Sequence, residues 1–209
     1  MKFPVKTVEK KLFESGYGYV CAVDEVGMGC LAGPVVVCAV GMTNTFHKKI
    51  HKKLRNLRES KLLNPAQREA FASWLVRDQG LVYALAVCSP RTIDKINIYE
   101  AARRAMRQAL KKIRPPFALK TVVLVDGKHP IQGVEHDQHA IVAGDRKVFA
   151  IACASVLAKV HRDRLMKRYA KKFPGYGFER HMGYGTKHHY ACLTELGPCP
   201  IHRRSFRLT

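Results

Sequence analysis

Short apolar runs bounded by glycine or polar residues recur along the chain and predict buried β-strands. Runs of about four to eight residues rich in Val, Ala and Cys, ended by turn residues, are typical of strands that are covered on both faces. The runs that fit this description are Tyr19–Val26, Pro34–Val40, Leu81–Cys88, Thr121–Val125 and a shorter one at His139–Val142.

Helical patterns fill most of the intervals between these runs. Residues 93–113 have helical periodicity and end before two consecutive prolines, which cannot continue a helix. Asn64-Pro65 opens another predicted helix, because Asn is a good cap and Pro suits the first helical position. Residues 148–172 form the longest predicted helix, which stops at Pro174-Gly175. Its buried stripe is Ile151, Ala154, Ala158, Leu165 and Tyr169.

The order of these elements predicts an α/β fold, because strands come first, alternate with helices in the middle of the chain and give way to helices later. We expect residues 1–174 to form a sheet domain in which residues 1–18 are a short helical lead-in. Residues 175–209 are rich in His, Gly, Tyr and Arg and are expected to form a small C-terminal subdomain.

Charge points to a polyanionic partner. The chain has 209 residues, with 37 Lys and Arg against 16 Asp and Glu, so its net charge is +21 and its pI is about 10.0. Such an excess repels itself in the folded state and attracts nucleic acid or, as a second candidate, an anionic membrane surface. With 47% hydrophobic residues the chain can bury a core, which excludes a disordered protein.

Two features bear on the compartment. The uncharged stretch Val26–Phe46 is interrupted by glycines and a proline, so it fits a loop feeding a strand better than a membrane span, and the N-terminus has no apolar core of signal-peptide length. Seven cysteines, an odd number without the dense spacing of secreted scaffolds, fit a reducing compartment. We therefore expect a cytoplasmic protein with no membrane partner.

Four carboxylates follow apolar runs at three predicted strand ends. Asp24 and Glu25 close the first strand, Asp126 ends the Val122–Val125 run, and Asp145 follows a run that ends in Gly144. Sites in α/β sheets collect at strand ends, and a hard divalent ion such as Mg²⁺ or Mn²⁺ would relieve the repulsion among these oxygens. A single such Asp more often caps a turn or helix. Four of them in a basic chain favour a metal-dependent nuclease, in which two ions activate water and stabilise the leaving oxygen.

The glycines after the first strand suggest a ligand-binding loop. In Gly27-Met28-Gly29 the backbone can approach a ligand closely, with amide groups free to donate. The alternative interpretation is a tight turn, and a lone pair of glycines does not decide between the two.

Longer motifs give the chain a family resemblance. From residue 17 to residue 206 they match in order, and together they resemble ribonuclease HII. The motifs are Tyr19–Pro34 with Asp24-Glu25-Val-Gly27-Met-Gly29, Glu59-Ser60-Lys61-Leu62, Val125-Asp126-Gly127, Gly144-Asp145, Ile151–Asp163, Tyr176-Gly-Phe178, His181–Thr186 and His202–Phe206.

The resemblance implies a ribonuclease H-like mixed β-sheet flanked by helices, with a small helical C-terminal subdomain that contributes to substrate binding. It implies an endoribonuclease that cuts the RNA strand of RNA–DNA hybrids and nicks duplex DNA on the 5′ side of single embedded ribonucleotides, leaving 3′-OH and 5′-phosphate ends. Asp24, Glu25, Asp126 and Asp145 then become the catalytic carboxylates that bind two Mg²⁺ or Mn²⁺ ions.

The same resemblance implies a substrate-binding set. Gly27-Met28-Gly29 would read the ribose 2′-OH, the group that distinguishes RNA from DNA. Tyr184 would stack on the sugar at the RNA–DNA junction, and Lys61 would contact a phosphate. The family carries Arg where Met28 stands, Asp where Glu59 stands and Lys where Met182 stands, so two positive charges near the substrate are missing from this chain.

Several other residues are candidates for a functional role. Asp163 is a rival for the fourth carboxylate, but its place in mid-helix beside Arg162 and Arg164 favours a surface ion-pair network. The basic residues of that helix, Arg162 to Lys172, and the cluster Lys48–Arg55 are expected to contact phosphates. His189-x-x-Cys192 and Cys199-x-x-His202 resemble zinc half-sites, although the short spacer between them disfavours zinc.

Two other classes of protein remain as alternatives. A non-catalytic basic nucleic-acid-binding protein explains the charge but not the four carboxylates. A ribonuclease HIII-like enzyme, which prefers longer ribonucleotide tracts, shares the chemistry but is disfavoured by the His202–Phe206 block. One catalytic constellation in one chain suffices, so we expect a monomer.

Overall fold

A computed structural model describes residues 6–50 and 60–208 of the chain. Its centre is a five-stranded sheet in the order β3-β2-β1-β4-β5. The strands are β1 (Tyr19–Val26), β2 (Val35–Thr43), β3 (Leu81–Cys88), β4 (Thr121–Asp126) and β5 (Asp137–Ile141). β1 pairs antiparallel with β2 and parallel with β4, so the sheet is mixed, as expected.

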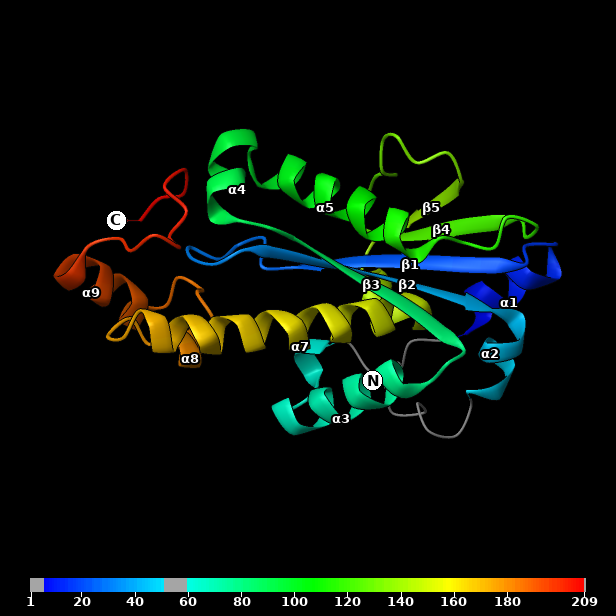
Figure 1. The fold of residues 1–209 in the computed structure, drawn as a ribbon, viewed down its shortest axis with the longest axis horizontal. Coiled ribbons are helices and arrows are strands. Elements are labelled where there is room, and N and C mark those ends of the chain that lie inside the picture. Colours follow the sequence, from blue (N-terminus) through cyan, green and yellow to red (C-terminus); the bar gives the residue numbers. More distant parts are fainter. Residues whose placement is uncertain (1–5, 51–59, 209) are drawn as a thin grey trace.

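Helices cover both faces of the sheet (Figure 1). On one face lie α4 (Pro90–Ile96) and α5 (Ile98–Ile113), and on the other lie α7 (Phe149–Lys172) and α3 (Pro65–Arg77). α1 (Thr7–Glu14) and α2 (Asn44–Lys49) lie at one end of the molecule. α8 (Phe178–His181) and α9 (Lys187–Leu196) lie at the other end, beside the C-terminal segment. Two short helices, η1 (Ser60–Leu62) and α6 (Gly144–Lys147), pack against α7.

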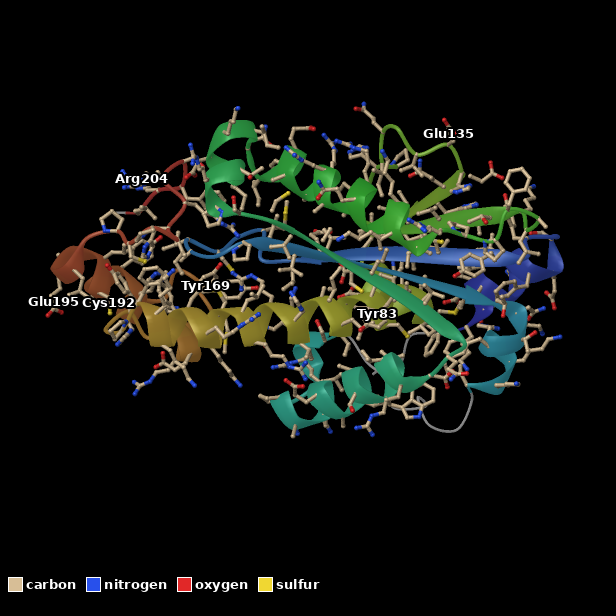
Figure 2. All side chains as sticks on the ribbon, viewed as in Figure 1. Tyr83, Glu135, Tyr169, Cys192, Glu195 and Arg204 are labelled. Carbon is tan, nitrogen blue, oxygen red and sulfur yellow. The ribbon has the colours of Figure 1, made fainter. Side chains whose placement is uncertain are left out.

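Strand alternation divides the core in two. Along β1, Val20 and Ala22 pack with α7, whereas Tyr19, Cys21 and Val23 pack with α5. A third, smaller cluster joins the end of α7 to α8, α9 and the C-terminal segment. Figure 2 shows Cys192 and Glu195 on α9 and Arg204 on the C-terminal segment at this same end of the molecule. The boundary between residues 174 and 175 stays a prediction.

The predicted elements need four corrections. The helix predicted over residues 93–113 is two helices, because Asn97 has a φ of 63° and its side chain caps α5 by accepting the Glu100 N–H. β2 continues to Thr43, three residues beyond the predicted end, because it pairs with β1 from Val36 to Thr43. β5 begins two residues earlier than predicted, at Asp137. α7 begins at Phe149, one residue later.

Other predictions from the sequence are confirmed. All seven cysteines are free thiols, and six of them are buried. Asn64 caps α3 with a reciprocal pair of hydrogen bonds to Gln67. In the described parts of the chain, every helix is too short or too polar to cross a bilayer.

Candidate active site

Two of the four carboxylates come from neighbouring parallel strands. The β1–β4 register pairs Ala22 with Leu124 and Val23 with Val125, and its continuation by one residue brings Asp24 alongside Asp126. Alternate residues of a strand face the same side of the sheet. Asp24 therefore faces the same side as Val20 and Ala22, and Asp126 the same side as Val122 and Leu124. Both sides are the one covered by α7. The end of the sheet therefore presents a carboxylate pair beneath α7.

Asp24 is buried, with 5% of its surface exposed. One of its oxygens accepts the backbone N–H of Glu25 at 2.8 Å. Burial raises the pKa of Asp24 well above its ordinary value, and the neighbouring Glu25 and Asp126 carboxylates raise it further, whereas a hydrogen bond from Ser155 on α7 lowers it. A cation at this position would restore the charged form.

Glu25 shares that environment. Burial and the Asp126 carboxylate raise the pKa of Glu25 to about 7, and Lys61 acts in the opposite direction. Its Oε2 atom is buried and has no hydrogen-bond partner among the described residues. An unsatisfied carboxylate oxygen is costly in a protein interior, so it indicates a binding partner that the protein chain itself does not supply.

Asp145 reaches the site through a tight connection after β5. Ala143 has a φ of 54°, and the N–H of Gly144 donates to Oδ1 of Asp126 at 2.7 Å. A Cβ atom on Gly144 would lie 2.5 Å from the Cδ1 atom of Ile151 and 3.3 Å from that same Asp126 oxygen, so a larger residue here would require the Ile151 side chain to shift. The turn places Asp145 in the first turn of α6.

All nine predicted site residues line one cavity of about 310 Å³. The structure thus brings together the four carboxylates, the glycine loop, Lys61 and Tyr184. It adds residues that sequence reasoning did not include in the site, namely Val26, Ser60, Ser155 and Lys159. Ser155 and Lys159 have the helical spacing of four residues within a motif that the resemblance already covered, and that spacing was the available signal.

A polar network ties the added residues to α7 and α3. The Ser60 and Ser155 hydroxyls are 3.0 Å apart, and Lys159 Nζ lies 2.6 Å from Asp163 Oδ1. Arg68 on α3 donates to the Ser60 carbonyl at 3.0 Å and lies 3.8 Å from Asp163. Asp163 therefore does form an ion-pair network rather than a fourth ligand, but the network is largely buried and its partners are Lys159 and Arg68.

The glycine loop meets Tyr184 at the mouth of the cavity. Cys30 and Tyr184 form an isolated antiparallel bridge, and Tyr184 remains 38% exposed. Gly27 has a φ of 97°, a conformation that favours glycine. Among the described residues, the N–H groups of Met28 and Gly29 have no hydrogen-bond acceptor. These donors remain available to a ligand.

The donor set fits a divalent cation that also takes ligands from solvent and substrate. Within residues 6–50 and 60–208, no group of three or more His, Cys, Asp or Glu side chains is arranged as a cage that could hold a metal ion. Mg²⁺ rarely uses such a cage, since it is commonly held by one or two carboxylates together with water and substrate phosphate oxygens. A carboxylate site of this open kind is expected to have a buried oxygen without a protein partner, as Glu25 Oε2 is, and a carboxyl group with a raised pKa, as Asp24 has.

Other cavities lack this convergence. One cavity of about 530 Å³ lies beside α2 and α3, and another of about 440 Å³ lies beside α1 and α2. Each has only one carboxylate among its lining residues. The zinc half-sites do not join, because His189 faces His202 whereas the Cys192 thiol donates to the Gly175 carbonyl. The larger cavities are therefore weaker candidates for an active site than the carboxylate cavity.

Part of the expected phosphate-binding surface is corrected. Arg162 does not lie on the basic face of α7, because it is fully buried. Arg164, Lys167, Arg168, Lys171 and Lys172 are exposed, and so are Lys48 and Lys49 on α2. Residues 51–55 of the basic cluster and Glu59 lie outside the described part of the chain.

Comparison with known sequences gives one consistent result. The family model for ribonuclease HII matches residues 21–209. The chain is 44% identical over 201 residues to a ribonuclease HII of Caldicellulosiruptor bescii, covering 95% of this chain and 91% of that protein. It is 41% identical over 202 residues to one of Listeria monocytogenes, covering 97% of this chain and 73% of that protein.

Solved structures share the fold. Ribonuclease H2 from Pyrococcus horikoshii superposes with a TM-score of 0.73 at 25% identity, covering 91% of this chain and 94% of that one. A ribonuclease HIII in complex with Mn²⁺ superposes with a TM-score of 0.65 at 16% identity, covering 92% of this chain and 68% of that one. At 16% identity the second likeness concerns the fold alone.

Proposed function

Because the chain belongs to the ribonuclease HII family, it is a ribonuclease H that acts on RNA–DNA hybrids, and we propose that Asp24, Glu25, Asp126 and Asp145 are its catalytic carboxylates. The observation that carries the proposal is the convergence of these four groups in a cavity that also contains the glycine loop and Tyr184. A non-catalytic binding protein would have no reason to keep four mutually repelling carboxylates in a chain of charge +21.

These carboxylates would hold two Mg²⁺ or Mn²⁺ ions, which would supply charge stabilisation to the attacked phosphodiester and lower the pKa of the attacking water. Divalent-metal dependence is a property of the family, and Mn²⁺ is bound in the solved ribonuclease HIII neighbour. Asp24 and Asp126 would face the scissile phosphate from the sheet, with Asp145 beside them. Lys61, whose charge already acts on Glu25, would offset the negative charge of the phosphate.

The substrate is proposed to include duplex DNA with a single embedded ribonucleotide, cut on its 5′ side to leave 3′-OH and 5′-phosphate ends. The free N–H groups of Met28 and Gly29 would donate to the ribose 2′-OH oxygen, which deoxyribose lacks. Tyr184 would stack on the sugar beside it. Such an activity would suit ribonucleotide removal from DNA and primer removal in replication.

The alternative within the same chemistry is an enzyme that prefers longer ribonucleotide tracts, as proposed above for a ribonuclease HIII-like protein. The presence of Met28 and Met182 in place of the family's basic residues favours this alternative, because both changes remove positive charge near the junction. The glycine loop beside Tyr184 favours the single-ribonucleotide substrate. We also propose that the enzyme is a cytoplasmic monomer with a catalytic domain of residues 1–174 and a substrate-binding subdomain of residues 175–209.

One assay tests the proposal. A labelled DNA duplex with one ribonucleotide and a second duplex with four consecutive ribonucleotides are incubated with Mg²⁺, with Mn²⁺ and with EDTA. We expect a metal-dependent nick 5′ to the single ribonucleotide. Cleavage of the second duplex alone would establish the longer-tract alternative, and no cleavage of either by folded protein would refute the catalytic assignment.

Asp24→Asn separates catalysis from binding. The substitution keeps the size of the side chain and removes its charge, so cleavage should fall by at least about a hundredfold, the equivalent of roughly 3 kcal/mol in the transition state. Binding of the duplex should persist or strengthen, because a negative charge facing the phosphates is lost. Asp163→Asn is the matched control, and it should retain far more activity because Asp163, unlike its ion-pair partner Lys159, does not line the cavity.

A further inference from the structure

Arg203, from the C-terminal segment, is fully buried against the glycine loop. Its guanidinium donates to the Gly27 carbonyl at 2.6 Å, the Met28 carbonyl at 2.9 Å and the Gly33 carbonyl at 3.0 Å. Its backbone N–H donates to Leu31 at 2.8 Å. One residue thus holds the loop at four points.

Arg162, from α7, is fully buried on the next part of the same loop. It donates to the Ala32 and Pro34 carbonyls, each at 3.0 Å, and to the Met182 carbonyl at 2.8 Å. Its guanidinium carbon also lies 5.9 Å from the centre of the Tyr184 ring. Arg162 therefore joins the glycine loop to the turn that carries Tyr184.

These two residues, the arginine clamp, are buried without the partners that buried charges usually have. Among the described residues neither guanidinium forms an ion pair with a carboxylate, and the two positive charges repel each other. Burying a charge is costly unless it is paired and hydrogen-bonded. Six backbone carbonyls satisfy the clamp, and a guanidinium suits that task because it presents five N–H donors in a fixed plane.

The loop has little freedom to move over the clamp. A Cβ atom on Gly27 would lie 2.4 Å from Arg162 Nε, and one on Gly183 would lie 2.4 Å from the Ala32 carbonyl oxygen. The backbone at these glycines thus packs directly against Arg162 and the Ala32 carbonyl, with no room for a side chain between them. A shift of the loop would break several hydrogen bonds at once.

The clamp also acts on the donors that face the cavity. Each peptide group links the carbonyl of one residue to the N–H of the next, so a cation at the Gly27 carbonyl polarises the Met28 N–H, and one at the Met28 carbonyl polarises the Gly29 N–H. Within the described part of the chain, the N–H groups of Met28 and Gly29 donate to no protein acceptor. Arg203 therefore strengthens and aims the very donors that are exposed to a ligand.

We infer that Arg162 and Arg203 are positioning residues for ribonucleotide recognition, which hold the glycine loop and Tyr184 in register and polarise the Met28 and Gly29 amides toward a 2′-OH. The inference rests on the proposed function, in which this loop reads the ribose. It assigns a specificity role to two residues that neither line the cavity nor touch the carboxylates.

The test compares binding of two duplexes that differ in one hydroxyl. Fluorescence anisotropy in EDTA gives the Kd for an all-deoxy duplex and for the same duplex with one ribonucleotide, and the ratio of the two is the discrimination. Arg203→Lys and Arg162→Lys keep the charge but lose the planar fork. Each should reduce the discrimination about tenfold, the effect of losing one good hydrogen bond to the loop, and leave the all-deoxy Kd within about twofold.

Leu75→Ala is the matched control for lost stability. Leu75, on α3, is fully buried in the core and away from the loop, so this variant should be destabilised yet keep the wild-type discrimination. A general loss of stability would instead lower binding to both duplexes in every variant.

The outcomes separate the two proposals. A wild-type ratio near one refutes ribonucleotide reading by the loop and the inference with it. A high wild-type ratio that persists in both Lys variants refutes the clamp alone. If neither Lys variant folds, as judged by circular dichroism, the arginines are fold determinants and the positioning role is rejected.

Discussion

His189 and His202 meet through their Nε2 atoms, which are 3.0 Å apart in a buried pair behind the Tyr184 turn. His189 Nδ1 donates to the Tyr184 carbonyl at 2.9 Å, and His202 Nδ1 accepts the Cys199 N–H at 2.9 Å. His202 Nδ1 also lies 3.3 Å from the Cys199 carbonyl, but the N–H contact is shorter, so we assign the His202 proton to Nε2, which donates to His189. Both imidazoles are neutral in this arrangement.

The histidine pair predicts sensitivity to acid. Burial, followed by the nearby His181 and His202, lowers the pKa of His189 from 6.5 to about 4, and burial lowers that of His202 as well. Because the unfolded chain binds these protons more readily than the folded one, the pair's contribution to stability is present above pH 6.5 and is lost as the pH falls toward 4.

Urea denaturation at several pH values checks this prediction. His189→Asn keeps a donor near Tyr184 and cannot titrate, so its free energy of unfolding should fall less between pH 6.5 and 4.5 than that of the wild type. His129→Asn, an exposed histidine, is the control and should follow the wild type. Identical pH slopes for the wild type and His189→Asn would contradict the neutral pair.

Glu9 predicts an opposite pH dependence at the other end of the molecule. It is fully buried, its Oε1 atom accepts the Ala150 N–H at 2.7 Å in the first turn of α7, and its Oε2 atom has no hydrogen-bond partner among the described residues. Burial raises the pKa of Glu9 from 4.5 to about 7. The folded state therefore holds this proton more tightly, and stability falls as the pH rises from 4.5 through 7.

Glu9→Gln should remove this effect. The variant keeps an acceptor for Ala150 but has no titrating group, so the difference in unfolding free energy between the two proteins should change by about 3 kcal/mol from pH 4.5 to pH 8. Glu14→Gln, on the exposed side of α1, should leave the wild-type pH profile unchanged. An unchanged profile in Glu9→Gln would show that folding does not raise the pKa of Glu9.

Met28→Arg should strengthen binding to substrate. The Met28 carbonyl accepts a hydrogen bond from Arg203, and the Met28 side chain packs partly against the core. This side chain carries no charge that could bind a phosphate. An arginine that reaches one phosphate should steepen the dependence of log K on log salt concentration by about 0.9. Filter binding from about 50 to 200 mM salt measures the slope. An unchanged slope would mean that the side chain at position 28 does not reach a phosphate of the nucleic acid.

Arg68→Ala should weaken substrate binding through Lys61. Arg68 donates to the carbonyls of Ser60 and Leu63, so it holds the short helix that carries Lys61 beside the cavity. We expect KM to rise several-fold for Lys61→Ala and for Arg68→Ala, and the double variant to be little worse than either. Fully additive effects on log(kcat/KM) would show that the two residues act separately.

The sheet and the carboxylate site could be predicted because both follow from local patterns. Asp24 and Asp126 come directly after apolar runs, and parallel strands must bring such ends together. Local signals likewise predicted α3, which begins at the Asn64 cap, and most of α7, which ends just before Pro174.

What could not be predicted depends on partners distant in the chain. Arg162 has the sequence context of an exposed basic helix, and only the folded loop supplies the carbonyls that permit its burial. Asn97 breaks a continuous helical period because its side chain caps α5, which overrides the apolar spacing. Ser60 reaches the cavity through Ser155, 95 residues away, and no local pattern records that pairing.

The hydrogen bond from Arg203 to Gly27 has a consequence for the order in which parts of the enzyme form during synthesis. The bond from Arg203 to Gly27 spans 176 residues, which a ribosome adds in roughly 10 to 35 seconds. Throughout that interval a nascent chain possesses Asp24 and Glu25 but not the residue that supports the loop beside them. The contacts that fix this loop therefore form only after nearly the whole chain has been synthesised, because contacts between residues distant in sequence must first overcome the entropy of loop closure.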